Sequence, residues 1–330
     1  YKISCGSAIG ASSIALALAL SLYKIKHASH AAGIRRRRAI ANNQNSKDMR
    51  KSVMYAIMAV VAILCAATTM ACYPGKNIKD NGEKVDITHS INAFTRLETN
   101  SPVDIKFVQG DNTSMRIVGS KSLADDIVVE QDSSTLTISS KDHGIHVFNV
   151  NGYDNRNITI YLSTPTITDV TVAGSGGFYA DGNISGSKLN FSLNGSGDVR
   201  LHKVTCDRLS LTLRGSGDMV ADEVACSDAA LLLLGSGDLK ARNLKAHNAD
   251  MQMKGSGDLD AMLSGTANTS IALLGSGDID VEFAGCGSAD CMLRGSGDIE
   301  LSGTLRSLSK STTGTGDIDV SKLKVKQAQY

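Results

Sequence analysis

The sequence predicts an all-β protein: a single-chain parallel β-helix, or β-solenoid, built from 20-residue coils. Three observations lead to this prediction. A Gly-Ser-Gly-Asp tetrapeptide recurs at fixed spacing, apolar residues alternate within each repeat, and large rings are scarce, with aromatic residues at 4% and no Trp. Bulky rings normally fill a thick globular core, so their scarcity favours a narrow core of Leu, Val, Ile and Ala.

The tetrapeptide begins at residues 195, 215, 235, 255, 275 and 295, always 20 residues apart. A variant, Gly-Thr-Gly-Asp, occupies 314–317, and Gly-Ser-Gly-Gly at 174–177 precedes the series. One coil of this length cannot bury its own inner face, so the coils must stack on one another. We expect about seven or eight coils, with the turn glycines adopting the positive φ that tight corners need.

Residues inside each coil alternate with the period of two that is typical of β-strands. In the coil that starts at residue 195, Val199 and Leu201 follow the turn, and Leu211 and Leu213 precede the next one. The same positions are mostly apolar in the other coils. Alternation of this kind points one face inward. We therefore expect about three short strands per coil, separated by corners.

Two regions of the β-structure differ in regularity. Residues 166–330 form the regular solenoid, and a less regular β region over 85–165 precedes it, with strands expected at 103–107, 114–118, 127–129 and 136–138. Near the other end, Lys322, Lys324 and Lys326 alternate with Leu323 and Val325. Charged side chains along an edge strand discourage pairing with further chains.

Residues 49–71 have the layout of a signal peptide. A charged start at Met49-Arg50-Lys51 is followed by an apolar run over 53–64, and small residues then lead to Cys72. That run is shorter than the about 20 residues of a membrane span. Residues 69–72 form an imperfect lipobox, which predicts a lipid anchor on Cys72 and a tether over 72–84. Cleavage after Ala71 without lipidation is the alternative.

Residues 1–48 are either upstream sequence outside the functional protein or a membrane segment with a basic stretch. The expected product is an exported outer-membrane or cell-surface lipoprotein, which contacts the membrane through its lipid anchor only, or else a periplasmic protein.

The charge of the chain argues against one class of partner. Residues 1–52 hold ten basic residues and one acid, which leaves 24 basic and 32 acidic residues in the remainder. A body with this net charge of −8 argues against nucleic acid, whose binding depends on Lys and Arg.

The aspartates of the tetrapeptide should stack into a ladder along the solenoid. Two interpretations stay open. Each carboxylate accepts hydrogen bonds from N–H groups of its turn, or the ladder binds calcium, a cation that favours carboxylate and carbonyl oxygens. The last coils add a second outward acid, so the calcium candidates are Asp258, Asp260, Asp278, Asp280, Asp298, Glu300, Asp317 and Asp319.

We expect no catalytic site and, calcium apart, no cofactor. Paired acids can hydrolyse a glycosidic bond, but uniform coils leave no long loops to build a cleft. No CxxC pair, phosphate-binding loop or zinc-binding helix is present. Cys206 and Cys226 occupy the same position of adjacent coils. They are either small buried residues or, in an oxidising envelope, a disulfide.

Several residues carry a resemblance to a known family. They are Phe94-Thr95-Arg96-Leu97, the 103–107 strand with Gln109-Gly110, Leu136-Thr137-Ile138 and the tetrapeptide series. Over roughly 85–325 the chain resembles the putative auto-transporter adhesin, head GIN domain family of bacterial envelope proteins. The resemblance implies a β-helical fold, an exported location and an adhesive or binding role, and it brings no catalytic or ligand residues with it.

The predicted function is that of an exported cell-envelope binding protein, adhesin-like and non-catalytic, acting through a regular, polar, acidic surface. Its partner would be a polysaccharide or a protein of the envelope or of a host surface. The alternatives are a purely structural envelope protein and a carbohydrate-active β-helix enzyme.

Overall fold

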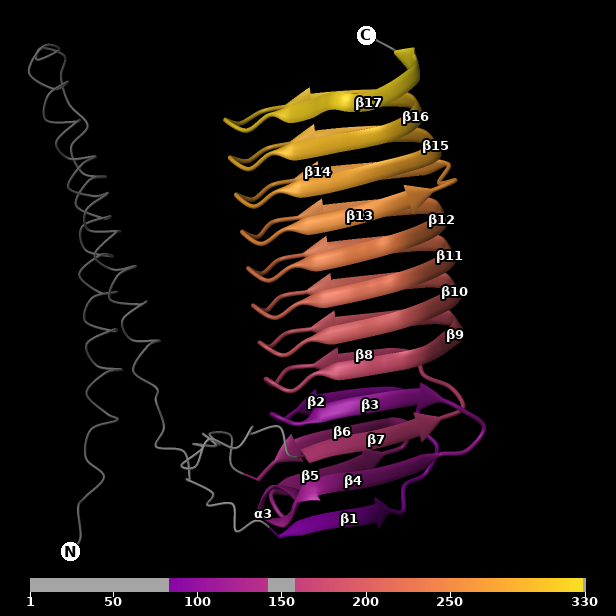
Figure 1. Cartoon of the computed structure of the whole chain (residues 1–330), viewed down its shortest axis with the longest axis vertical. Helices are drawn as coiled ribbons and strands as arrows, with labels where there is room; N and C mark the ends of the chain where they lie inside the picture. The colour runs from indigo at the N-terminus through magenta and orange to yellow at the C-terminus, as the bar shows by residue number, and fades with distance from the viewer. Residues whose placement is uncertain (1–82, 142–157, 329–330) are drawn as a thin grey trace, which may run out of the picture. The chain divides into compact units, whose positions relative to one another are not determined.

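The computed structural model describes residues 83–141 and 158–328. The irregular region contains β1 (Lys84–His89), β2 (Arg96–Asn100), β3 (Asp104–Gln109), β4 (Ser114–Ser120), the short helix α3 (Lys121–Ala124), β5 (Ile127–Asp132), β6 (Thr135–Ser140) and β7 (Ile158–Thr164). The regular region contains β8 (Asp169–Val172), β9 (Phe178–Leu193), β10 (Val199–Leu213), β11 (Met219–Leu233), β12 (Leu239–Met253), β13 (Leu259–Ser264), β14 (Asn268–Leu273), β15 (Ile279–Leu293), β16 (Ile299–Thr312) and β17 (Ile318–Ala328). The all-β parallel solenoid is confirmed (Figure 1).

The first seven strands form the irregular end of this stack. Strand β4 pairs antiparallel with β1 and β7, and β5 pairs antiparallel with β6. The change to parallel pairing comes through β2, which pairs with β6 and β8, and through β3, which pairs with β7 and β9. Strands expected at 103–107, 114–118, 127–129 and 136–138 correspond to β3, β4, β5 and β6.

From β9 onward the coils stack in parallel register. Val199 pairs with Met219, and Met219 pairs in turn with Leu239. Each strand is continuous around the coil, yet β10 pairs with β11 in three runs, 199–201, 203–205 and 208–213. Two outward residues follow one another at 202–203 and again at 207–208, where the alternation changes phase. These phase changes are the corners, so each coil has three flat segments, as predicted.

The turn glycines have a different role from the expected one. The glycines with positive φ in the described chain are Gly119, Gly265, Gly285 and Gly303, and none belongs to a Gly-Ser-Gly-Asp turn. The expectation of positive φ in these turns was therefore wrong. The turns instead stack so closely that a Cβ atom on Gly217 would lie 1.7 Å from the carbonyl oxygen of Gly197. A backbone without side chains is required because the coils are in contact here.

A narrow apolar core runs along the axis of the stack. Leu201, Leu211 and Leu213 are completely buried, and the equivalent positions of neighbouring coils are buried as well. Larger rings occur where the irregular region meets the solenoid. There Phe178 packs between Phe107 and Phe191, with ring centroids 5.5 Å and 6.3 Å apart. Rings thus fill the core at this junction, and aliphatic side chains fill most of the regular coils, with Phe283 of β15 as a buried exception.

One coil departs from the regular pattern. Its wall is divided into β13 and β14 around Gly265, whose φ is +64°. The last strand, β17, pairs with β16 and presents the alternating lysines that the sequence predicted, with Lys322 bonded to Glu300 at 2.5 Å. In the part of the chain that the structure describes, no helix is long and apolar enough to cross a membrane.

Candidate binding surfaces on the solenoid

The turn aspartates form a hydrogen-bonded ladder. Oδ1 of Asp198 accepts from the backbone N–H of Asp218 at 3.2 Å, and Oδ1 of Asp298 accepts from that of Asp317 at 2.8 Å. The same contact joins the aspartates of every coil between these two pairs. Each carboxylate therefore satisfies a turn N–H of the next coil. One of the two interpretations of the aspartate ladder was that each carboxylate accepts from N–H groups of its own turn. The structure shows such hydrogen bonds, but the donor N–H belongs to the turn of the next coil.

We expect Asp218→Ala to lower the free energy of unfolding by about 1 kcal/mol, because the Asp238 N–H loses its 3.2 Å acceptor. Asp218→Asn keeps an oxygen at the same place and should change stability much less. Urea unfolding followed by circular dichroism measures both variants. Equal loss in the two variants would mean that charge, and not the hydrogen bond, is what the ladder contributes.

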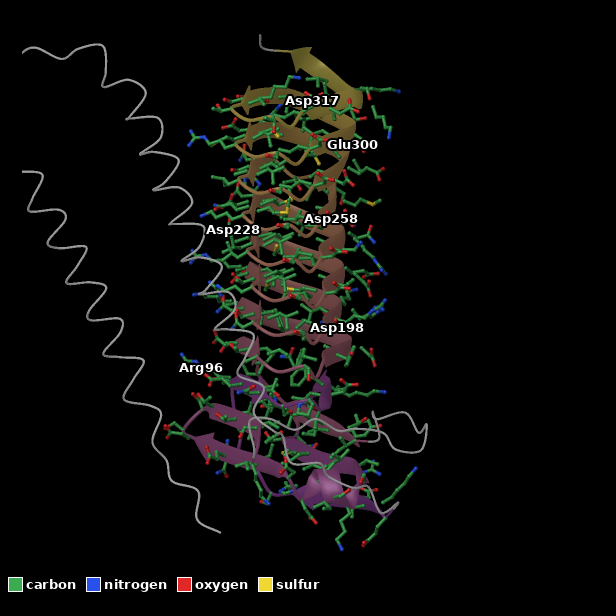
Figure 2. The ribbon with its side chains drawn as sticks, turned by 90° about the vertical axis from the view of Figure 1, so that its left-hand side faces the viewer. Arg96, Asp198, Asp228, Asp258, Glu300 and Asp317 are labelled. Atoms are coloured by element: carbon green, nitrogen blue, oxygen red, sulfur yellow. The ribbon has the colours of Figure 1, made fainter. Side chains whose placement is uncertain are left out.

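A second acidic row lies two residues beyond the ladder in the last coils. Asp260 bonds to Lys240 at 2.9 Å, and Glu300 bonds to Lys322. Asp280, between them, has a raised pKa because of partial burial and the neighbouring charges of Asp260 and Glu300. These acids and Lys240 line a shallow open hollow. Figure 2 shows Glu300 near Asp317 at this end of the stack.

The predicted calcium ligands thus occupy two neighbouring outward rows. Asp258, Asp278, Asp298 and Asp317 belong to the ladder; Asp260, Asp280, Glu300 and Asp319 belong to the second row. In residues 83–141 and 158–328, no three His, Cys, Asp or Glu side chains are grouped so that they could hold a metal ion. Calcium binding stays a prediction. The predicted lipid anchor, Cys72, lies outside the described residues.

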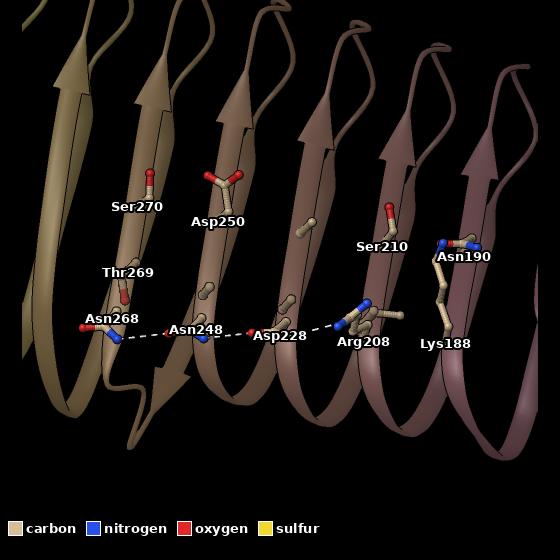
Figure 3. A pocket seen from close by; sticks show the side chains of 14 residues that line it. Lys188, Asn190, Arg208, Ser210, Asp228, Asn248, Asp250, Asn268, Thr269 and Ser270 are labelled. Atoms are coloured by element: carbon tan, nitrogen blue, oxygen red, sulfur yellow. Dashed lines mark hydrogen bonds and ion pairs between the residues drawn. The ribbon is translucent and has the colours of Figure 1, made fainter.

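A second groove crosses the coils from β9 to β14 on another side of the stack, and its volume is about 480 Å³, compared with about 730 Å³ for the hollow at the acidic rows. Two outward rows flank it. The first row is Lys188, Arg208, Asp228, Asn248 and Asn268. The second row is Asn190, Ser210, Ala230, Asp250 and Ser270. Inward residues lie between the rows, and the floor that they form is apolar at Leu209, Ala229 and Ala249 and polar at Thr269 (Figure 3).

Hydrogen bonds hold the first row in place. Asn248 Nδ2 donates to Asp228 Oδ1 at 2.8 Å, and Asn268 Nδ2 donates to Asn248 Oδ1 at 3.0 Å. Asp228 also lies 3.8 Å from the guanidinium of Arg208. The side chains are therefore connected along the groove, as Figure 3 shows.

Sequence reasoning missed this groove. It followed the inward positions of the repeat and the turn aspartates, and it left the outward positions on either side of residues 209, 229 and 249 unexamined. A signal was present: the outward position that is basic in Lys188 and Arg208 becomes Asp228, Asn248 and Asn268 in the following coils. In a uniform structural repeat we would expect the same kind of residue at this position in every coil, so the change along this row was a sign that the surface is specialised.

This fold, with its open grooves and repeated polar rows, defines a parallel β-solenoid of about eight turns. The chain belongs to the family described as putative auto-transporter adhesin, head GIN domain, which matches residues 93–275 and 264–330. The resemblance drawn from the sequence is thus confirmed. The family indicates an exported surface or envelope protein. Comparison with curated proteins finds no match.

Solved structures support the same fold. A putative lipid binding protein from Parabacteroides distasonis is 25% identical, with a TM-score of 0.63 over 74% of this chain and 98% of that one. A putative adhesin from Parabacteroides merdae is 19% identical, with a TM-score of 0.61 over 74% and 100%. A third, a putative adhesin from Bacteroides fragilis, is 21% identical, with a TM-score of 0.53 over the same shares.

Proposed function

We propose that this protein is an exported, non-catalytic binding protein of the cell envelope that holds an extended polysaccharide in the groove across β9 to β14. One observation carries the proposal: two rows of side chains, all able to form hydrogen bonds except Ala230, flank a largely apolar strip and repeat with the coils. An extended polysaccharide has the complementary surface, with C–H faces between edges of hydroxyl groups. Binding sites typically combine an apolar lining with a few fixed polar groups.

The dimensions suit a chain and not a small molecule. Adjacent coils are about 4.8 Å apart, so the groove from β9 to β14 extends for roughly 19 Å. The two outward rows are separated by roughly 6.6 Å, the length of two strand residues. Solenoids generally bind along such extended surfaces. Successive sugar units would meet successive coils, each offering an amide, a carboxylate or a hydroxyl.

The predicted N-terminal segments and the family support a proposal for the cellular setting. We propose export by the signal peptide over 49–71, followed by lipidation at Cys72 and display on the outer membrane or the cell surface. Cleavage after Ala71 without lipidation would yield a periplasmic form. Labelled palmitate incorporated by the wild-type chain and lost in Cys72→Ala would support the anchor, whereas equal labelling would contradict it.

Filling the groove should abolish binding. Ala230 is an exposed residue of the second row, and Ala225 is an exposed residue of the same strand outside the groove. We expect Ala230→Arg to weaken polysaccharide binding at least about tenfold, which equals about 1.4 kcal/mol, because the new side chain occupies the apolar strip. Ala225→Arg adds the same charge elsewhere and should bind like the wild type. Glycan arrays followed by calorimetry measure the affinities.

The other outcomes each contradict a defined part of the proposal. Release of new reducing ends would make the protein a carbohydrate-active enzyme, with Asp228 and Asp250 as the first acids to test. Binding lost in both arginine variants, or in neither, would remove the groove from the mechanism. Binding that disappears with EDTA would favour calcium at the acidic rows. No detectable binding to any glycan or surface protein would favour a purely structural role.

Phospholipid vesicles belong in the same panel, because one solved relative is named a putative lipid binding protein. The apolar floor of the groove, with Leu209 and the two alanines at 229 and 249, is the observation that favours them. Saturable vesicle binding that Ala230→Arg prevents would replace the polysaccharide by an acyl chain as the groove's ligand.

A further inference from the structure

We infer that Cys206 and Cys226 are a redox-active pair that closes a disulfide between the coils of β10 and β11. Both thiols are free in this structure and both are half-buried. They occupy equivalent positions of adjacent coils, since Thr205 pairs with Ala225 and Arg208 with Asp228 on either side of them. The pair lies outside the proposed ligand groove, so the inference is independent of the proposed function.

The backbone geometry fits a disulfide. Adjacent strands are about 4.7–4.9 Å apart, and the Cα atoms of disulfides are usually about 4.4–6.8 Å apart. The two Cβ atoms must come somewhat closer than the strand spacing, to about 3.5–4.5 Å. A corner allows this movement, because the pairing of β10 with β11 is interrupted between residues 205 and 208. The disulfide can therefore close without breaking a ladder pair between β10 and β11.

The two thiols already interact with each other. A hydrogen bond with the Cys226 thiol lowers the pKa of Cys206, and the same contact, together with burial, raises the pKa of Cys226. The nearby carboxylates Asp207 and Asp228 act against ionisation of Cys206 and Cys226, respectively. Because the thiolate is the attacking form in disulfide exchange, the lowered pKa favours Cys206 as the attacking thiol.

The reaction balances with a low-molecular-weight disulfide as the oxidant. The Cys206 thiolate attacks one sulfur of that disulfide, forms a mixed disulfide and releases one small thiolate, which takes up a proton. Cys226 then loses its proton and attacks Sγ of Cys206, which expels the second small thiol. Overall the two protein thiols lose two hydrogens and two electrons, and the oxidant becomes two thiols.

The remaining cysteines of the described chain serve as internal controls. Cys286 and Cys291 are buried, with 6% and 0% of their surface exposed, and burial raises the pKa of Cys291 to about 12. A buried thiol of high pKa reacts slowly with a disulfide. In the next coil the position of Cys226 is taken by Ala246, and Cys286 occupies it only two coils further on. Oxidation should therefore be confined to one pair of coils.

The test is a peptide map of the full chain after treatment with oxidised glutathione. Free thiols are blocked with N-ethylmaleimide in denaturant, and trypsin then releases peptides 204–208 and 215–240, which hold the two cysteines. We expect these peptides to be linked and to lack two hydrogens, while Cys286 and Cys291 carry the blocking group. In Cys226→Ser, glutathione should remain on Cys206, because no second thiol is present to expel it.

Two results would overturn the inference. One is fully blocked Cys206 and Cys226 after prolonged exposure of the wild-type chain. The other is glutathione that stays on Cys206 although Cys226 is present, since this would show that the thiols cannot reach each other. Urea unfolding of the oxidised and the reduced chain completes the test. The oxidised chain should unfold at a higher urea concentration, because the disulfide prevents β10 and β11 from separating.

Discussion

Replacing Gly237 by alanine is expected to prevent the solenoid from folding, or to lower its free energy of unfolding by about 4 kcal/mol or more. An added Cβ would lie 1.9 Å from the carbonyl oxygen of Gly217 and 2.8 Å from its carbonyl carbon. Neither atom can move aside, because both belong to the backbone of the preceding turn. The coils of β11 and β12 would have to separate, and the hydrogen bonds and core contacts between them would weaken together.

The matched control is Gly182→Ala in β9. A Cβ at Gly182 meets no atom within 4 Å, and its φ is not positive. This substitution should leave stability nearly unchanged. Urea unfolding of both variants, followed by circular dichroism and by the fraction recovered as soluble protein, measures the difference. Equal midpoints for the two variants would show that the turns do not stack as closely as described.

Truncation of Phe178 is the second large effect. Phe178→Ala should cost about 3–5 kcal/mol, because the ring is completely buried between Phe107 and Phe191. The residue also belongs to the one strand that pairs with β3 on one side and β10 on the other. A cavity at this place weakens the contact between the irregular region and the first regular coils. Coils of a solenoid are stabilised mainly by their neighbours.

Two comparisons isolate the cause. Phe178→Leu keeps most of the apolar volume and should lose distinctly less stability than the alanine variant. Val108→Ala shortens a side chain that is 54% exposed in the adjoining strand and should be nearly neutral. Thermal and urea unfolding measure all three. A Phe178→Ala protein as stable as Val108→Ala would mean that the junction contributes little to the fold.

Several features of the fold could be predicted because they depend on the repeat itself. A constant 20-residue spacing keeps equivalent residues in register from coil to coil, so the inward positions of one coil identify those of all others. Leu201, Leu211 and Leu213 are buried as predicted. Four strands of the irregular region, β3 to β6, were also predicted from their alternation, whereas β1, β2 and β7 were not.

The role of the turn glycines could not be predicted in the same way. Gly-Ser-Gly-Asp suggests a corner that needs positive φ, and that expectation was wrong. The restriction on Gly217 and Gly237 comes from the carbonyl groups of the preceding coil. Such a contact joins residues 20 positions apart and depends on how closely two turns stack. The distance between two stacked turns cannot be inferred from the sequence of either turn.

By itself, the sequence determined the coil length, the inward faces, the solenoid class and the family. The tertiary structure alone decided which outward side chains meet. Arg208, Asp228 and Asn248 are unrelated when each coil is considered singly, and they become one wall of a groove when the coils stack. The physical reason is that burial is governed by alternation within a coil, whereas surface contacts are governed by the register between coils and by where each corner turns.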